Sequence, residues 1–169
     1  MEGKAVLFDQ LAGISGVPIL LDTSDPDEVV ETVKHISKGY GGILLEDIGS
    51  PHCFEIEERL KEELTIPVMH DDQHGTAVVT LAATLSACRY AGVDIKDAVV
   101  GQIGLGAAGL AICRMLLAYG VDEVYGTDPQ ESAVMRLRQY GGNVLSSVED
   151  VMAHCDIVIA TTGVKGLID

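Results

Sequence analysis

Short apolar runs alternate with segments of helical periodicity along the chain. Apolar runs of strand length stand at residues 17–22, 42–47, 67–71, 98–103, 123–127 and 156–161. Helical patterns occupy residues 25–39, 52–64, 75–92, 106–119, 132–140 and 148–154. Because strand and helix alternate throughout, the chain is predicted to be an α/β protein with parallel sheets and right-handed crossovers.

Three of the helical segments carry more specific signals. Asp25 is expected to be an N-cap, with Pro26 at the first helical position and Glu28 closing a capping box. The segment 52–64 is amphipathic, and its Glu and Lys residues are interpreted as a solvated face. The segment 75–92 is apolar on nearly all sides, which predicts a helix buried between two layers or two domains.

Composition and charge restrict the class of protein. The 169 residues are 47% hydrophobic and 22% charged, with a mean hydropathy of +0.27, as is typical of a globular fold. A net charge of -15 argues against a nucleic-acid surface, because phosphate binding needs clustered lysine and arginine. Asp9 breaks the first apolar stretch and Gln102 the longest one, so neither a signal peptide nor a membrane span is expected. The four scattered cysteines indicate buried thiols, and we expect a cytoplasmic protein.

The segment VVGQIGLGAAGLA places three glycines between an apolar strand and a helix. Gly104, Gly106 and Gly109 form the pattern G-x-G-x-x-G. In this pattern the three glycines allow, in order, a tight turn, the close approach of a pyrophosphate and close helix packing. Ala107 and Ala108 begin the helix, whose free N–H groups and positive dipole end favour phosphates. These five residues are therefore candidates for binding a dinucleotide.

An acid follows this motif at the spacing that a dinucleotide site requires. Asp128 ends the next strand near the position, ~20 residues after the first glycine, where an acid binds the adenine ribose. Because no Arg or Lys follows Asp128 directly to hold a 2′-phosphate, NAD is favoured over NADP. The alternative is a glycine-rich turn in another α/β protein, such as a methyltransferase-like one.

Acidic side chains also gather at the ends of two earlier strands. Glu46 and Asp47 follow one apolar run and Asp72 follows another, and parallel strands place such ends at one edge of the sheet. Their hard oxygen atoms suit Mg²⁺ or Mn²⁺. Two alternatives stay open: His70 and His74 as zinc ligands, or acids that are solvated loop residues.

The chain resembles the malic enzymes in their bacterial form. The similar motifs are MEGKAVLF, DPDEVVETVK, GGILLEDI, CFEIEERL, IPVMHDDQHGTA, GLGAAG and DIVIATTGVKGLI, and LEDI joined to HDDQHGTA is highly specific. The resemblance implies a catalytic domain, with residues 1–73 as part of it, followed by a Rossmann-type NAD-binding domain at residues 74–169. It also implies oxidative decarboxylation of malate to pyruvate and CO₂, with NAD and a divalent metal, in a homo-oligomer.

The resemblance assigns roles to single residues. Lys4, in EGKA, matches the catalytic lysine, which is the general base, and Asp71 matches its partner acid. The metal ligands correspond to Glu46, Asp47 and Asp72. The turn that approaches the nicotinamide ribose corresponds to Thr162 and Gly163. If the strand continues through residue 71, alternation directs Asp71 to Lys4 and Asp72 to the metal.

The chain departs from the family pattern at several positions. Its five tyrosines match none of the motif that carries the general-acid tyrosine, and the substrate-binding arginine and the asparagine segments have no counterpart. Asp9 stands where related sequences carry a lysine. We therefore expect an internal fragment of the enzyme that does not turn over malate on its own. The alternative is a non-catalytic module that binds NAD.

Overall fold

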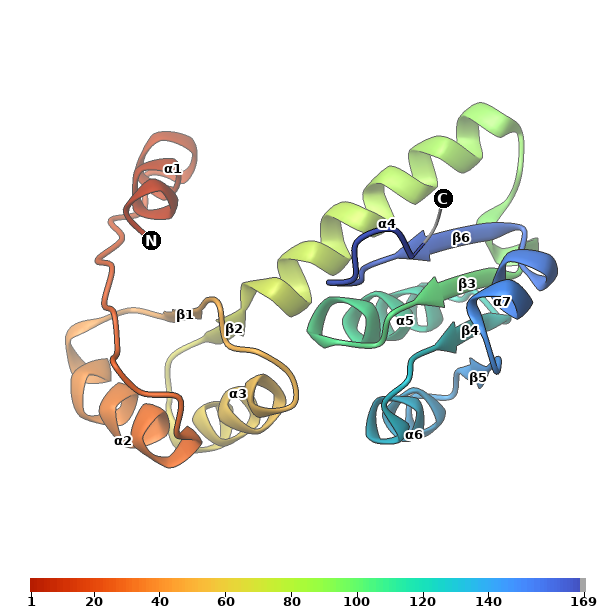
Figure 1. Cartoon of the computed structure of the whole chain (residues 1–169). Helices are drawn as coiled ribbons and strands as arrows, with labels where there is room; N and C mark the ends of the chain where they lie inside the picture. Colours follow the sequence, from red (N-terminus) through yellow and green to blue (C-terminus); the bar gives the residue numbers. More distant parts are fainter. Residues whose placement is uncertain (168–169) are drawn as a thin grey trace.

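The structure, a computed structural model, describes residues 1–167 as two lobes joined by one long helix (Figure 1). The first lobe contains α1 (Glu2–Ala12), α2 (Pro26–Ile36), the 3₁₀ helix η1 (Ser37–Gly39), β1 (Ile43–Leu45), α3 (His52–Glu63) and β2 (Val68–His70). Helix α4 (Asp71–Ala91) leads into the second lobe. That lobe contains η2 (Ile95–Asp97), β3 (Val100–Ile103), α5 (Ala107–Tyr119), β4 (Val124–Thr127), α6 (Glu131–Gln139), β5 (Asn143–Val144), α7 (Val148–His154) and β6 (Ile157–Ala160).

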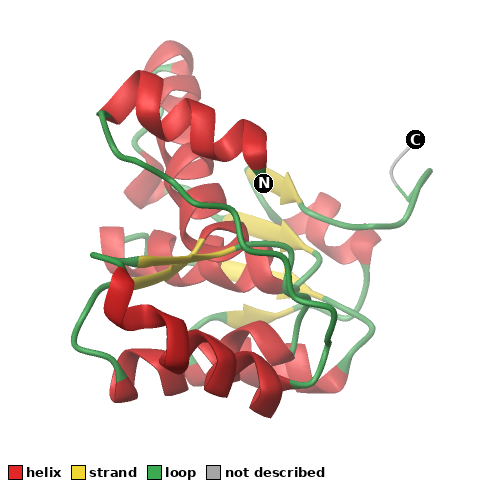
Figure 2. Ribbon diagram, turned by 90° about the vertical axis from the view of Figure 1, so that its left-hand side faces the viewer, coloured by secondary structure: helices red, strands yellow, loops and turns green. Residues whose placement is uncertain are grey.

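Both sheets are parallel, so the predicted α/β class is confirmed. In the first lobe β1 pairs with β2, with Leu45 opposite His70. In the second lobe the strand order is β5-β4-β3-β6, and every pairing is parallel. Helices flank both sheets (Figure 2). The short strand β5 is not foreseen by the sequence pattern.

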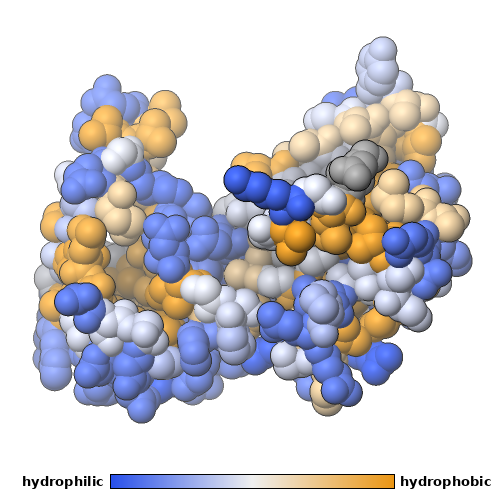
Figure 3. All heavy atoms as spheres, viewed as in Figure 1, coloured by the Kyte–Doolittle hydropathy of each residue, from blue (hydrophilic) through white to orange (hydrophobic). Residues whose placement is uncertain are grey.

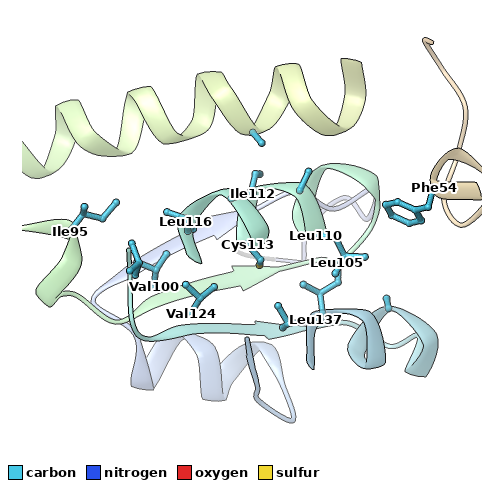
Figure 4. Packing of buried hydrophobic residues seen from close by; sticks show 14 of the residues in the cluster. Phe54, Ile95, Val100, Leu105, Leu110, Ile112, Cys113, Leu116, Val124 and Leu137 are labelled. Atoms are coloured by element: carbon cyan, nitrogen blue, oxygen red, sulfur yellow. The ribbon is translucent and has the colours of Figure 1, made fainter. Parts of the chain in front are cut away.

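Helices cover both faces of the larger sheet. Gln102 and Gly126 are register partners, and a Cβ at Gly126 would meet Leu137 of α6, which places α6 on the face of Gln102. A Cβ at Gly109 of α5 would approach the Gln102 side chain on that same face. The neighbouring Gly101 instead faces Val151 of α7. The main core lies on the α5 side of the sheet, where α4 packs over α5 (Figure 4).

The two lobes share one apolar cluster. Phe54 of α3 lies at the end of the core near Leu105 and Leu110 (Figure 4), and the Arg136 guanidinium stands 4.7 Å from the Phe54 ring centroid. A cation over an aromatic face is attracted by the ring quadrupole. Ile48 packs against this cluster and against the smaller core of the first lobe. These contacts connect α3 to the second lobe independently of α4.

The predicted strand at residues 17–22 is wrong. The segment between α1 and α2 has no strand (Figure 1). Val17, Leu20 and Leu21 are exposed there. It lines, together with α1 and β1, a groove of about 750 Å³, and apolar residues reach the surface of both lobes (Figure 3). An apolar run becomes a strand where a neighbouring strand supplies a hydrogen-bonding ladder. Among the described residues, β1 pairs with β2 and not with residues 17–22.

The caps of α2 follow the prediction in part. Asp25 is the N-cap and accepts the backbone N–H of Asp27 at 2.9 Å, with Pro26 at the first helical position. The capping box is wrong, because Glu28 accepts the Thr23 hydroxyl instead of the backbone N–H of Asp25. The Thr23 hydroxyl bridges the two residues: it accepts the Asp25 N–H and donates to the Glu28 carboxylate.

The junction between β2 and α4 also differs from the prediction. β2 ends at His70, and Asp71 is the first residue of α4, so the expected strand through residue 71 is wrong there. The prediction that this helix is buried between two layers or two domains holds for one face only: Val78 and Val79 are more than half exposed, and Tyr90 is 97% exposed. One stripe of α4 packs on α5, and the opposite face is open. No helix among residues 1–167 is long and apolar enough to cross a membrane.

A buried carboxylate fixes this junction. Glu57 of α3 has a side chain that is 7% exposed. It accepts the backbone N–H of His70 at 3.0 Å and the Gln73 amide at 3.2 Å. His74 Nε2 lies 2.7 Å away and Lys61 Nζ 2.8 Å away. The interpretation of all acids of this helix as a solvated face is therefore wrong at Glu57, because a buried carboxylate persists only with partners of this kind.

We expect Glu57→Gln to lower the free energy of unfolding by about 1–3 kcal/mol at neutral pH, since hydrogen bonds to a charged acceptor are lost. Burial raises the pKa of Glu57, but hydrogen bonds from Lys61 and His74 outweigh burial, and the pKa lies below its ordinary value of 4.5. The stabilisation is therefore fully present above pH 4.5 and is lost as the pH falls through the lowered pKa. Urea unfolding over a pH series checks both statements.

The matched control for this prediction is Glu58→Gln, a change of the same chemistry at an exposed position of α3. It should leave the free energy of unfolding nearly unchanged at every pH. Equal effects of the two substitutions would contradict the prediction.

Candidate active site and dinucleotide turn

Lys4 of α1 lies between two acids from other elements. Its Nζ is 2.7 Å from Asp71 Oδ2, at the start of α4, and 2.8 Å from Glu46 Oε1, just after β1. Glu46 and Asp71 come together because each directly follows a member of the register pair Leu45 and His70. The structure thus brings together one lysine and two acids from three separate sequence motifs.

The charges around Lys4 stabilise its ammonium form. The hydrogen bond to Asp71 raises the pKa of Lys4 above its ordinary value, and Glu46 raises it further, against the opposing effect of burial. The Lys4 side chain is 36% exposed, and that of Glu46 is 10% exposed. Water therefore reaches the lysine from one side, while the carboxylate behind it is largely shielded.

Asp47 and Asp72 lie beside this group. The backbone N–H of Asp47 donates to Asp72 Oδ2 at 3.0 Å, and Asp47 has a left-handed backbone with φ 57°. Aspartate tolerates this conformation better than most residues. The two adjacent acids of the HDDQ segment thus have different partners: Asp71 binds Lys4, as expected, whereas Asp72 accepts a backbone N–H. They diverge because they are successive residues of a helix, not because a strand alternates.

The acidic set fits a hard divalent cation by its chemistry but does not gather into a closed metal site. Glu46, Asp47 and Asp72 supply oxygen atoms of the type that Mg²⁺ and Mn²⁺ prefer. In the structure, however, Glu46 contacts Lys4, and Asp72 accepts a backbone N–H. Within residues 1–167, no three His, Cys, Asp or Glu side chains are arranged to hold a metal ion.

The two histidines of this segment are placed differently. His70 is fully buried, with Nε2 3.5 Å from Asp72 Oδ2, and burial lowers the pKa of His70. His74 Nε2 is directed at Glu57. Of the two histidines considered as zinc ligands, His74 thus binds a buried carboxylate through its Nε2.

In the second lobe, β3 and α5 enclose the glycine turn. Gly104 has φ 87°, and a Cβ there would lie 2.5 Å from the Thr161 carbonyl oxygen. A Cβ at Gly109 would overlap the carbonyl oxygen of Gly104. A Cβ at Gly106, by contrast, would have no protein atom within 4 Å. The first and third glycines are required by the protein itself, while the second faces open space in front of the α5 N-terminus.

Asp128 connects the end of β4 to this turn. Its Oδ2 accepts the backbone N–H of Leu105 at 2.7 Å, and its Oδ1 accepts that of Gln130 at 2.8 Å. Ala107 and Ala108 are the first residues of α5, where the N–H groups have no acceptor within the helix. Asp128 therefore contacts the turn directly before the α5 N-terminus.

Residues at the end of β6 complete the turn. Gln102 of β3 is fully buried, and its Nε2 donates to Thr161 Oγ1 at 2.8 Å and to the Gly104 carbonyl at 3.0 Å. Thr162 accepts the Val164 N–H at 3.1 Å, and a Cβ at Gly163 would have no atom within 4 Å. Sequence reasoning did not assign a role to Gln102 or to Glu57. A polar residue inside an apolar strand was the available signal for Gln102.

Two family models match adjacent parts of the chain. Residues 1–61 match the model described as malic enzyme, N-terminal domain. Residues 69–165 match the model described as D-isomer specific 2-hydroxyacid dehydrogenase, NAD binding domain. The first range contains Lys4 and Glu46, and the second contains Asp71 and the glycine turn.

Curated relatives align with nearly the whole chain. NAD-dependent malic enzyme 1 of Bacillus subtilis (strain 168) is 79% identical over 168 residues, which are 99% of this chain and 38% of the relative. The NAD-dependent malic enzyme of Geobacillus stearothermophilus is 46% identical over 96% of this chain and 36% of its own length. The chain thus spans little more than a third of the length of these relatives.

Solved structures agree in fold. The NAD-dependent malic enzyme of Thermotoga maritima superposes with a TM-score of 0.86 at 38% identity, over 95% of this chain and 46% of that one. The malic enzyme of Entamoeba histolytica gives a TM-score of 0.87 at 32% identity, over 95% of this chain and 38% of that one. Sequence and fold agree: the chain belongs to the malic enzyme family, and it carries an NAD-binding domain of the D-isomer specific 2-hydroxyacid dehydrogenase family.

Proposed function

We propose that the full-length protein catalyses the oxidative decarboxylation of malate to pyruvate and CO₂, with NAD as the oxidant. The observation that carries this proposal is the placement of the Lys4 ammonium between Asp71 and Glu46. In this proposal, residues 1–73 are part of a catalytic domain and residues 74–169 are the NAD-binding domain. The protein acts in the cytoplasm as a homo-oligomer.

NAD is proposed to bind at the glycine turn. The pyrophosphate would lie over Gly106 and the N–H groups of Ala107, Ala108 and Gly109, next to Gly104, because that space is open and the helix dipole favours anions there. Asp128 would accept the adenine ribose hydroxyls, and Thr162 and Gly163 would lie toward the nicotinamide ribose. When bound, NAD supplies the hydride acceptor.

Glu46, Asp47 and Asp72 are proposed to hold Mg²⁺ or Mn²⁺. Such a cation polarises a coordinated hydroxyl or carbonyl group. The support is the set of hard oxygen atoms at two neighbouring strand ends, with one ammonium among the acids Glu46, Asp47, Asp71 and Asp72. This excess of negative charge favours a further cation.

Lys4 is proposed to exchange a proton with the malate C2 hydroxyl, with Asp71 as its partner. The two carboxylates raise the pKa of Lys4, so the free site holds the ammonium form. To act as a base, Lys4 must be in the neutral amine form, which the two carboxylates disfavour. Glu46 would present less negative charge to Lys4 if it also held the proposed metal ion, while Asp71 would keep the amine in place.

The alternative function is a non-catalytic module that binds NAD. It is supported by the complete glycine turn, and it requires nothing of Lys4. The two functions are separated by malate-dependent formation of NADH.

We expect the full-length protein to form NADH from malate and NAD in the presence of Mn²⁺. Lys4→Ala should lower kcat by about 10²-fold or more, as is typical for loss of a general acid–base group. Lys38→Ala, at an exposed lysine of the same lobe, is the control and should leave kcat unchanged. If the protein binds NAD but forms no NADH from malate, and Lys4→Ala does not change NAD binding, the protein is the non-catalytic binding module.

Gly106→Val should abolish NAD binding without destabilising the fold. The new side chain meets no protein atom, but it fills the space proposed for the pyrophosphate. Gly109→Ala should do the opposite and lower the free energy of unfolding by about 1–3 kcal/mol, because its Cβ overlaps the Gly104 carbonyl. Titration calorimetry with NAD and urea unfolding of both variants test the assignment, which is wrong if Gly106→Val binds NAD normally.

Asp128→Asn should weaken NAD binding by about tenfold or more, since charged acceptors contribute more to hydrogen bonds than neutral ones. Asparagine is preferred to alanine because it keeps one acceptor for the Leu105 or Gln130 N–H groups. NADP binding should fall less, because the carboxylate repels a 2′-phosphate. Asp122→Asn, at an exposed acid before β4, is the control, and equal losses for NAD and NADP would rule out the ribose contact.

A further inference from the structure

Gly75 is the fifth residue of α4, a position where alanine would stabilise the helix more than glycine does. Glycine weakens helix interiors because it loses the most backbone entropy on folding. Its backbone is helical here, so no left-handed conformation demands a glycine. Some other constraint must explain the missing side chain.

The space of the missing side chain is taken by Asp71. A Cβ at Gly75 would have three nearest atoms, and all three belong to the Asp71 carboxylate group: it would overlap Oδ1, approach Cγ to 2.9 Å and lie 3.4 Å from Oδ2. The two residues are one helical turn apart, and side chains of a helix lean toward its N-terminus. A side chain at residue 75 would therefore project onto the carboxylate of residue 71.

The same carboxylate holds Lys4. Asp71 Oδ2 accepts the Lys4 ammonium at 2.7 Å, while Oδ1 lies against the Gly75 backbone. Asp71 has a short side chain, so its carboxylate can avoid a new methyl group only by turning about χ1 and χ2. Such a turn moves Oδ2 away from the lysine.

We propose that Gly75 is a positioning residue, whose absent side chain keeps open the Asp71 conformation that faces Lys4. The consequence for catalysis rests on the proposed function, whereas the geometric statement does not. Substitution by alanine separates the two demands on this position. The helix gains a better residue, and the Lys4–Asp71 ion pair loses its geometry.

The experiment compares Gly75→Ala with the wild type, both in the full-length protein labelled with ¹⁵N-lysine. In NMR spectra an ammonium held by carboxylates exchanges its protons slowly with water. Lys4 should show this behaviour in the wild-type chain, and Lys4→Arg identifies its signal. In Gly75→Ala we expect Lys4 proton exchange to be faster by about tenfold or more, as for loss of a charge-assisted hydrogen bond. The urea midpoint should stay equal or rise.

Two variants calibrate this result. Asp71→Asn removes the negative charge of this acceptor and gives the Lys4 exchange rate without the ion pair to Asp71, while the ion pair to Glu46 is kept. Gly3→Ala makes the same glycine-to-alanine change in α1, next to Lys4, where a Cβ would have no atom within 4 Å. It should leave the exchange rate at the wild-type value.

Three results overturn the proposal. The Lys4 exchange rate in Gly75→Ala could equal that of the wild type, or the wild-type rate could already be as fast as that of Asp71→Asn. A lower urea midpoint in Gly75→Ala would show a packing role. A malate assay on the full-length protein is independent of these results. There Gly75→Ala should lower kcat and leave the KM for NAD unchanged. If the wild-type protein does not oxidise malate, the proposed function fails while the NMR result on Gly75 stands.

Discussion

The buried carboxylate of Glu57 determines where β2 ends and α4 begins. It binds the last N–H of the strand and two side chains of the first helical turn, His74 and Gln73. Asp71 and Asp72 lie within that clamped stretch, so their positions relative to β1 follow from it. An acid on an amphipathic helix, ordinarily a solvated residue, here sets the geometry of the site.

A second constraint is the balance of charge around Lys4. Helix α1 has no buried residue of its own, and its lysine reaches Asp71 across 67 positions of sequence. An exposed ion pair stabilises little, but this one places a proton-carrying group beside acids that are held by other elements. Glu46 is the shielded member of the group, and loss of Lys4 would leave its charge partly buried without a partner.

The sequence predicted the second lobe well and the first lobe less well. Apart from β5, the strands and helices from Val100 to Ala160 lie close to the expected ranges, and α5 and α7 are bounded by a glycine or a cap that acts locally. Residues 17–22 have an equally apolar pattern but no strand, since pairing depends on a neighbour that local signals do not reveal. The grouping of Lys4 with Asp71 came from the resemblance to a family, because no local rule connects residues so distant. Glu57 was missed because the helical pattern identifies a polar face and does not say what covers it.

The glycines of the chain show how a sequence motif divides between folding and binding. Gly104 and Gly109 are needed by the protein, because side chains there would strike the Thr161 and Gly104 carbonyls. No protein atom would contact a side chain at Gly106, so the missing side chain matters only for a molecule that binds from outside. Gly75 is a third kind: its space is filled by the Asp71 carboxylate, which binds Lys4. A motif alone does not separate these cases, whereas the atoms that a Cβ would meet do so residue by residue.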